Sequence, residues 1–353
     1  MAGAGSHGLR ARLTSKTALR VLWLVFIAAI VYTLLPTLTR MPEQAREALN
    51  IKWYALGIGL LLEVASQVAG MVAFRRVLEE MRVEPVPRGF ALARLWLGQT
   101  TLTTILPAGS VTASAMIADV LRRNGADTAR AATATALSKA ISVVVLLVFF
   151  VIGLALSIDR LQDTRSPYLT TTVIAVPVLA LGLAVIGAGL VWPALARRAT
   201  TAVLRPLARL HRRIDPQAAG ERAQELAGLA RALLGSGSGI LTCVISLAFW
   251  VFDWAVLVAM LWALGHLDAL GPTIIAYTAA RISSMLPITP GGIGVVEVIM
   301  TALLAAFGTP GRIAAIAVIA YRLISFWLLN IIGAFAAATI RRGMAGGAPA
   351  AAA

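Results

Sequence analysis

The sequence predicts an all-α fold: a polytopic membrane helix bundle of about six full spans plus two re-entrant hairpins in an inverted repeat. The 353 residues are 59% hydrophobic and only 13% charged, whereas soluble proteins carry about 25% charged residues. The apolar residues gather in blocks of roughly 20, which is the length of a helix that crosses a bilayer. These blocks lack the period-two alternation of barrel strands. Together the observations exclude a soluble domain and a β-barrel.

Six apolar blocks have the length and composition of full spans. They are Val21–Leu38, Trp53–Phe74, Leu137–Ser157, Tyr168–Trp192, Ile240–Leu264 and Ile313–Ile340. Two further stretches, Leu95–Ala118 and Thr273–Phe307, are interrupted near the middle by proline and glycine. Proline removes a helix hydrogen bond, and such a break inside a membrane is tolerated only where it is buried or lines a wet cavity.

The charges between the blocks predict how the interrupted stretches are oriented. Arginine and lysine concentrate in the N-terminal segment, after the second span, after the first interrupted stretch, in 193–238 and at Arg341-Arg342. Placing every basic segment in the cytoplasm makes each interrupted stretch enter and leave on one side, as a re-entrant hairpin. Each half then has two spans, a hairpin and a closing span, in opposite orientations. The alternative for the second stretch is two short spans.

The same charges predict the organisation of the chain. We expect a basic cytoplasmic N-terminus at 1–19, membrane segments at 20–192 and 239–342, a basic cytoplasmic connector at 193–238, and a disordered tail at 343–353. The formal net charge of +15 is interpreted as positive-inside loops that face anionic lipid head groups, and not as a nucleic-acid surface. We expect a multi-pass protein of the plasma membrane with both termini in the cytoplasm.

The second break is the most informative segment of the chain. Its glycines, Gly291, Gly292 and Gly294, follow Pro290 and expose backbone amides where the helix resumes. The N-terminus of that helix is suited to an anion such as phosphate. Glu297 lies in its first turn, where the carboxylate either serves function or caps local amides.

Four more positions are candidate site residues because charged side chains inside a membrane are costly. Arg281 precedes the second break, and Arg322 lies in the last span and needs Glu297, carbonyls or a lipid phosphate as its partner. Glu63 and Asp253 occupy corresponding spans of the two halves, and their alternative role is hydrogen bonding between helices. Pro107 and Gly109 mark the first break and complete the predicted substrate site.

The sequence lacks the motifs of several kinds of transport and catalysis. No Walker A motif is present, so ATP-driven transport by this chain is not expected, and Gly291–Gly294 lacks the strand context of a nucleotide loop. The motif H-E-x-x-H is absent, and the three histidines are scattered. We therefore expect no metal, no cofactor and no catalytic residue.

The second break resembles the lysylphosphatidylglycerol synthase transmembrane family, also called flippase-like or UPF0104 proteins. The resemblance rests on the pattern P-G-G-x-G-x-x-E and a following Tyr-Arg, here Pro290, Gly291, Gly292, Gly294, Glu297 and Tyr321-Arg322. The first break, with Pro107 and Gly109, and the later Leu121–Gly125 look like the family's first-half element. The similarity covers roughly 51–340.

Two departures qualify what the resemblance implies. Ser110-Val111-Thr112 follow the first-half glycine, where many members have an acidic residue or arginine. Members that make aminoacylated lipids carry a large synthase domain, which is not found before Ala353. The resemblance therefore implies translocation of an anionic lipid, either a phospholipid or a polyprenyl-phosphate-linked sugar, and no tRNA-dependent transfer.

Two other functions are left as alternatives. The chain could be a non-transporting membrane subunit or scaffold for a lipid-synthesis enzyme or glycosyltransferase, with the basic connector as the docking surface. An enzyme acting on lipid head groups is the least favoured, because no paired carboxylates or nucleophile–base arrangement is evident.

Overall fold

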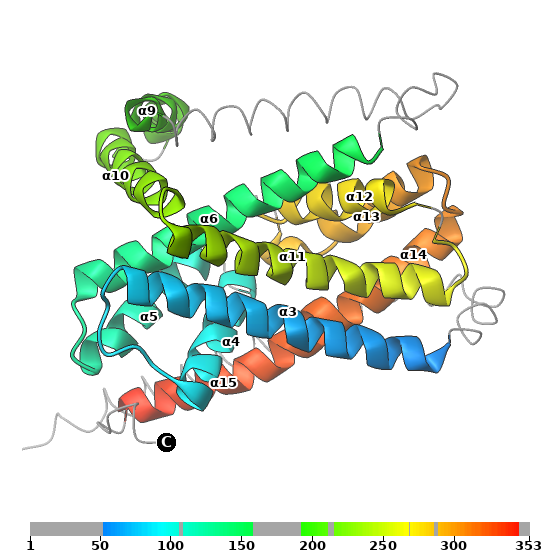
Figure 1. The fold of residues 1–353 in the computed structure, drawn as a ribbon, viewed down its shortest axis with the longest axis horizontal. Helices are drawn as coiled ribbons and strands as arrows, with labels where there is room; N and C mark the ends of the chain where they lie inside the picture. The colour runs from blue at the N-terminus through cyan, green and yellow to red at the C-terminus, as the bar shows by residue number, and fades with distance from the viewer. Residues whose placement is uncertain are drawn as a thin grey trace, which may run out of the picture. The chain divides into compact units, whose positions relative to one another are not determined.

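A computed structural model describes residues 52–105, 109–157, 192–210, 215–267, 269–285 and 289–345. Within these ranges the chain is helical and contains no strand (Figure 1). The helices are α3 (Trp53–Glu80), α4 (Gly89–Ile105), α5 (Gly109–Arg123), α6 (Thr128–Ala155), α9 (Pro193–Leu210), α10 (Pro216–Leu234), α11 (Gly237–Ala263), α12 (Leu270–Ser283), the 3-10 turn η1 (Pro290–Gly292), α13 (Val295–Ala306), α14 (Gly311–Arg322), the π-helix η2 (Leu323–Leu328) and α15 (Leu329–Ala345).

Four described helices are long and apolar enough to cross a membrane. They are Trp53–Glu80, Thr128–Ala155, Gly237–Ala263 and the continuous stretch Gly311–Ile340. Each contains or closely matches one of the predicted spans, which confirms a membrane helix bundle. The predicted spans Val21–Leu38 and Tyr168–Trp192 lie outside the described residues, apart from Trp192, so the total number of spans stays a prediction.

One span begins earlier than the apolar pattern indicated. Helix α6 starts at Thr128, because the side chain of Asp127 accepts a hydrogen bond from the amide of Ala129 and caps the first turn. The first turns of α6 therefore lie outside the apolar block that began at Leu137.

Both interrupted stretches form pairs of helices joined through the break. Helices α4 and α5 contact each other on either side of 106–108, and α12 and α13 contact each other across η1. Figure 1 places α12 and α13 side by side next to α14, away from the end where α5 lies. Each pair therefore has the arrangement of the predicted hairpin, and Pro107 lies outside the described residues.

The contacts of the two halves match when the halves are exchanged. Helix α3 packs along α11, and Figure 1 shows the two running in opposite directions. Helix α4 packs on α15, while its counterpart α12 packs on α6. The contacts of α5 with α6 and of α3 with α6 likewise correspond to those of α13 with α14 and of α11 with α14. This is the pattern of an inverted repeat.

Glycine residues allow α15 to approach α4 closely and α12 to approach α6 closely. A Cβ built on Gly333 of α15 would lie 2.6 Å from the carbonyl oxygen of Leu97 in α4. A Cβ built on Gly271 of α12 would lie 2.8 Å from the backbone of Leu156, which directly follows α6. Close backbone approach through glycine is the usual way in which membrane helices gain packing energy.

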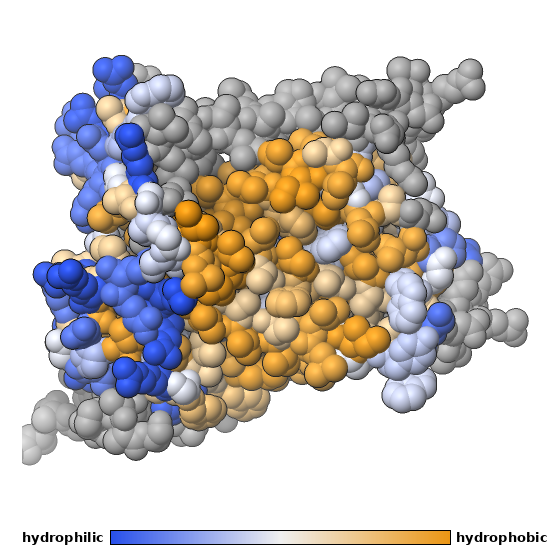
Figure 2. All heavy atoms as spheres, in the orientation of Figure 1, coloured by the Kyte–Doolittle hydropathy of each residue, from blue (hydrophilic) through white to orange (hydrophobic). Residues whose placement is uncertain are grey.

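The surface divides into an apolar band and hydrophilic ends. Figure 2 shows a broad hydrophobic region over the long helices and a strongly hydrophilic end where α9 and α10 lie. Large apolar side chains of the helices are exposed, as at Leu61 (72%), Val298 (68%) and Phe335 (66%). Exposed apolar side chains of this kind match a lipid environment.

The two connecting helices fall in the predicted connector. Helices α9 and α10 contact each other and occupy most of 193–238. Helix α15 continues to Ala345, so the first residues of the expected tail at 343–353 belong to that helix, and the remainder lies outside the described residues. The side of the membrane on which these parts lie stays a prediction.

Candidate functional site

The second break is shaped by glycines that adopt left-handed backbone angles. Gly291, Gly292 and Gly294 have φ values of 63°, 65° and 83°, which side chains with a Cβ rarely adopt. A Cβ on Gly291 would lie 2.6 Å from the Phe326 ring and 3.2 Å from the carbonyl oxygen of Thr104. Because Thr104 lies in the last turn of α4, the end of α4 meets the second break.

An ion pair locks the second break to the last span. Arg322 donates from Nε to Glu297 Oε1 at 2.8 Å and from Nη2 to the carbonyl oxygen of Gly291 at 3.3 Å. The other carboxylate oxygen, Oε2 of Glu297, accepts from the amide of Gly294 at 2.8 Å. The guanidinium also lies 3.8 Å from the centre of the Phe326 ring, a cation–π contact. Glu297 therefore caps α13 and also balances the buried charge of Arg322.

A second polar cluster surrounds Asp253 of α11. Its Oδ2 accepts from the Tyr277 hydroxyl at 2.5 Å and lies 3.2 Å from Nη2 of Arg281, and both residues belong to α12. The Tyr321 hydroxyl of α14 donates to both Asp253 oxygens at 3.2 and 3.3 Å. Arg281 also stacks over Trp250, with its guanidinium carbon 5.4 Å from the ring centre. Asp253 thus holds three helices together around a charged centre.

Glu63 of α3 meets this cluster from the other half of the repeat. Its Oε1 accepts from Nε2 of Gln67 at 2.8 Å, and the Gln67 carbonyl oxygen accepts from Nε1 of Trp96 in α4 at 2.9 Å. The other carboxylate oxygen, Oε2 of Glu63, is buried and has no hydrogen-bond donor among the described residues. Helices α3 and α11 run antiparallel, with Gly59 against Val256 and Met260 and with Ser66 donating to the carbonyl oxygen of Phe249, so Glu63 lies opposite Asp253. The two corresponding carboxyls of the repeat are therefore neighbours.

The two clusters are joined at the end of α14. Tyr321 reaches Asp253, and the next residue, Arg322, reaches Glu297. The π-helix η2 begins directly afterwards at Leu323, and π-helical turns inside helices occur frequently at functional sites. The side chains of Arg281 and Glu297 are 20% and 21% exposed, so each cluster has one charged group that is partly accessible.

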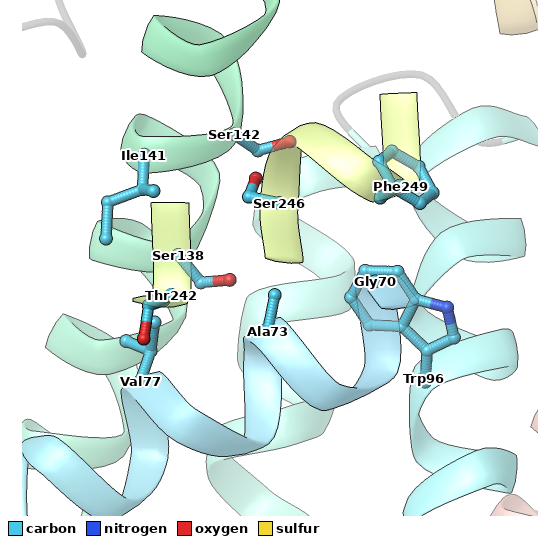
Figure 3. Close-up of a pocket in the computed structure, with 10 residues that line it drawn as sticks. All are labelled: Gly70, Ala73, Val77, Trp96, Ser138, Ile141, Ser142, Thr242, Ser246 and Phe249. Carbon is cyan, nitrogen blue, oxygen red and sulfur yellow. The ribbon is translucent and has the colours of Figure 1, made fainter. Parts of the chain in front are cut away.

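A small polar cavity lies between α3, α4, α6 and α11. Figure 3 shows Ser138 and Ser142 of α6 facing Thr242 and Ser246 of α11 across it. Trp96 also lines the cavity, which has a volume of about 20 Å³. A polar space of this size admits a water molecule. Trp96 connects the cavity to Gln67 and hence to Glu63.

The structure brings most predicted site residues into one region. Glu63, Asp253 and Arg281 form one cluster, and the glycines of the second break form the other with Glu297 and Arg322. Gly109 begins α5 and Pro290 begins η1. Whether these residues bind substrate stays a prediction.

Tyr277 and Trp96 were not predicted as site residues. Tyr277 lies one helical turn before Arg281, so the spacing of a helix places both on one face, and this signal was available. Trp96 gave no such signal, because its importance depends on a contact with another helix. Among the described residues, no three His, Cys, Asp or Glu side chains gather closely enough to hold a metal ion.

The fold and these two clusters define a polytopic helical membrane protein with an inverted repeat and buried charged groups beside its second break. The chain belongs to the family described as the lysylphosphatidylglycerol synthase TM region, whose model matches residues 19–333. The match confirms the family suggested by the glycine-rich break. The matched region is a membrane domain, and the family name refers to the membrane part of the synthase.

The comparison with curated proteins gives a partial relative. A UPF0104 membrane protein of Methanothermobacter thermautotrophicus is 33% identical over 91 residues, which cover 26% of this chain and 27% of that protein. The similar segment therefore spans about a quarter of the relative's length. No solved structure matches this chain.

Proposed function

We propose that this protein moves an anionic lipid between the two leaflets of the plasma membrane and has no catalytic activity of its own. The substrate is a phospholipid or a polyprenyl-phosphate-linked sugar. The observation that carries the proposal is the contact between the end of α4 and the glycines of the second break, beside two charged clusters inside an apolar bundle. Charged groups in the interior of a membrane protein commonly mark a substrate path.

Arg281 is the residue that we assign to the lipid phosphate. Its side chain is 20% exposed and its partner Asp253 is 2% exposed, so an incoming head group meets the guanidinium first. A guanidinium has five donors and binds phosphate in a bidentate manner. The acyl chains stay in the bilayer along the exposed apolar surface, where Leu323 is 46% exposed next to the buried Arg322.

The second break offers a further contact for the phosphate. In the structure, the Glu297 carboxylate accepts the hydrogen bond of the Gly294 amide at the start of α13. A carboxylate at a helix N-terminus fills the place that favours an anion. A lipid phosphate that displaced Glu297 would gain the same amide and the neighbouring Arg322, so we assign Glu297 to a gating role.

The connector fits an orientation toward the cytoplasm. Exposed arginines on α9 and α10, among them Arg205, Arg222 and Arg231, are suited to the anionic inner leaflet, where each basic group near the surface contributes about 1 kcal/mol. This orientation places both termini in the cytoplasm, since the number of spans is taken as even.

A reconstitution assay tests the proposal. Purified protein is placed in vesicles of phosphatidylcholine and phosphatidylglycerol that carry a fluorescent phosphatidylglycerol, and a membrane-impermeant quencher reports the outer leaflet. We expect wild-type protein to raise translocation above empty vesicles and Arg281→Gln to lose the increase. The control Arg75→Gln removes an exposed arginine that pairs with Glu79, and should behave as wild type.

Two results would oppose the proposal. Wild-type vesicles that match empty ones for phosphatidylglycerol and for a polyprenyl-phosphate sugar would remove it. Equal rates for Arg281→Gln and wild type would show that Arg281 does not contact the lipid.

The scaffold alternative is favoured by a different observation, the basic helix α9 with its exposed Arg197, Arg198 and Arg205, which packs on α10. These helices form a surface outside the apolar band (Figure 2), suited to an acidic partner such as a lipid-synthesis enzyme. Capture of such an enzyme, with function retained in a Glu297→Ala and Arg322→Ala double variant, would support this reading over transport.

A further inference from the structure

The carboxyl groups of Glu63 and Asp253 carry an unbalanced charge inside the bundle. Glu63 is 4% exposed and Asp253 is 2% exposed. When both are ionised they contribute two negative charges, and Arg281 contributes one positive charge. The neighbouring pair of Glu297 and Arg322 is neutral by itself. One negative charge is therefore left uncompensated, and an uncompensated charge inside a membrane protein costs several kcal/mol.

The hydrogen bonds around the two carboxyls show where a compensating group belongs. Asp253 already receives donors from Tyr277, Tyr321 and Arg281. Glu63 receives one donor, from Gln67, and its Oε2 has none within the part of the chain that the structure describes. A single proton between Oε2 and the Asp253 carboxyl would satisfy this oxygen and also remove the repulsion between the two groups.

The helices packed around the pair supply few charged or titratable side chains. Helix α12 provides Arg281 and Tyr277, α14 provides Tyr321, and α4 provides Trp96. In α6 the nearest cation is Lys139, whose Nζ lies 5.8 Å from the centre of the Trp96 ring and not against either carboxyl. The described residues therefore place no further cation against the two carboxyls, and a proton is the smallest cation that can compensate the charge.

We propose that Glu63 and Asp253 form a shared proton-binding site that couples lipid movement to a proton gradient, an inference that rests on the proposed function. The proton binds between one carboxylate oxygen of Glu63 and one of Asp253. When the proton leaves, both carboxyl groups are ionised. No other bond forms or breaks.

The small cavity places room for a water molecule near this site. Its four hydroxyl groups and its volume of about 20 Å³ suit a water molecule (Figure 3). From its wall, Trp96 donates to Gln67, and Gln67 donates to Glu63. Gly70, which also lines the cavity, lies two helical turns from Glu63 on α3.

Arg281 links the proton to the lipid. When a lipid phosphate draws the Arg281 guanidinium from Asp253, the carboxyl pair loses its cation and binds a proton more tightly. By reciprocity the proton increases the affinity for the anionic lipid. The lipid and the proton are therefore expected to move together in the same direction.

Infrared spectroscopy of the purified full-length protein tests the proton site directly. We expect the carbonyl stretch of a protonated, buried carboxyl group, which disappears on alkalinisation. Glu63→Gln and Asp253→Asn should each abolish it, because either change leaves one carboxylate beside Arg281. The control Glu79→Gln alters a carboxylate that is 44% exposed and should leave the signal unchanged. Glu63→Asp keeps an acid at the site and should restore it.

Vesicles that contain fluorescent phosphatidylglycerol test the coupling. We expect wild-type translocation to be faster when the pH gradient and the lipid run in the same direction, slower when the gradient is reversed, and insensitive to the gradient in Glu63→Gln.

Each opposing result has a defined meaning. Absence of the carboxyl signal in wild-type protein across the pH range in which it stays folded overturns the proton site. Survival of the signal in Asp253→Asn overturns the sharing of one proton. Lipid movement that ignores the gradient overturns the coupling, whereas absence of lipid movement with the expected infrared signals removes the proposed function and leaves the proton site standing.

Discussion

Substitution of Gly291 by alanine is expected to destabilise the protein through two separable effects. The residue has a φ of 63°, and the left-handed conformation costs a residue with a Cβ about 1–2 kcal/mol. The new methyl group would also lie 2.6 Å from the Phe326 ring, and overpacking of this kind costs about 1–3 kcal/mol. The expected loss in the free energy of unfolding is therefore about 2–5 kcal/mol.

Two other glycines separate the contributions. Gly294 has a φ of 83°, and a Cβ there would meet nothing within 4 Å, so Gly294→Ala should cost only the about 1–2 kcal/mol of backbone strain. Gly57 lies within α3 with ordinary helical angles and also has free space around it. Gly57→Ala should therefore be neutral or stabilise by about 0.5–1 kcal/mol.

The assay is reversible unfolding in mixed micelles, with titration by a denaturing detergent and helix content as the signal. The expected order of stability is Gly57→Ala, then Gly294→Ala, then Gly291→Ala. Equal stability of the last two would refute the close contact with Phe326. Equal stability of all three would refute the left-handed backbone and with it the described shape of the break.

Three further predictions concern the helices that carry the site, and the same unfolding assay checks them. Arg322→Ala should lower the free energy of unfolding by about 3 kcal/mol, the low end for a broken buried ion pair, because Glu297 keeps 21% exposure. If the additional change Glu297→Ala recovered none of this loss, the pairing would be contradicted. Gly333→Leu should separate α15 from α4 and cost at least about 1–3 kcal/mol by overpacking, and wild-type stability would contradict the close approach to Leu97. Asp127→Ala should cost about 1 kcal/mol through loss of the α6 cap, whereas Asp127→Asn, which can still cap, should cost clearly less; equal losses would argue against the cap.

The apolar blocks and their interruptions could be predicted from the sequence because they are properties of short, contiguous segments. A block of about 20 apolar residues has few states other than a membrane helix, and proline with paired glycines has few roles inside one other than a break. The pairs α4 with α5 and α12 with α13 were therefore predicted as hairpins, and the glycine-rich break at Pro290–Glu297 identified the family.

The start of α6 was predicted less well, because the apolar pattern does not report polar helical turns. Asp127 caps a helix whose first turns are not apolar, and only the cap shows where it begins. The prediction of Glu297 left two readings open, and the structure shows that its carboxylate caps α13 and pairs with Arg322 at once.

The sequence by itself determined the membrane class, the approximate positions of the four described spans and the kinds of residue at the breaks. Only the tertiary structure decided which of them meet: Glu63 with Asp253, Asp253 with Tyr277 and Tyr321, and Gly291 with the end of α4. The physical reason is that helical periodicity fixes which side chains share a face of one helix, whereas contacts between helices depend on the depth and rotation of each helix in the bundle. The depth and rotation are set by the packing of all helices together. Examples are the close contacts of Gly333 in α15 with α4 and of Gly271 in α12 with the end of α6.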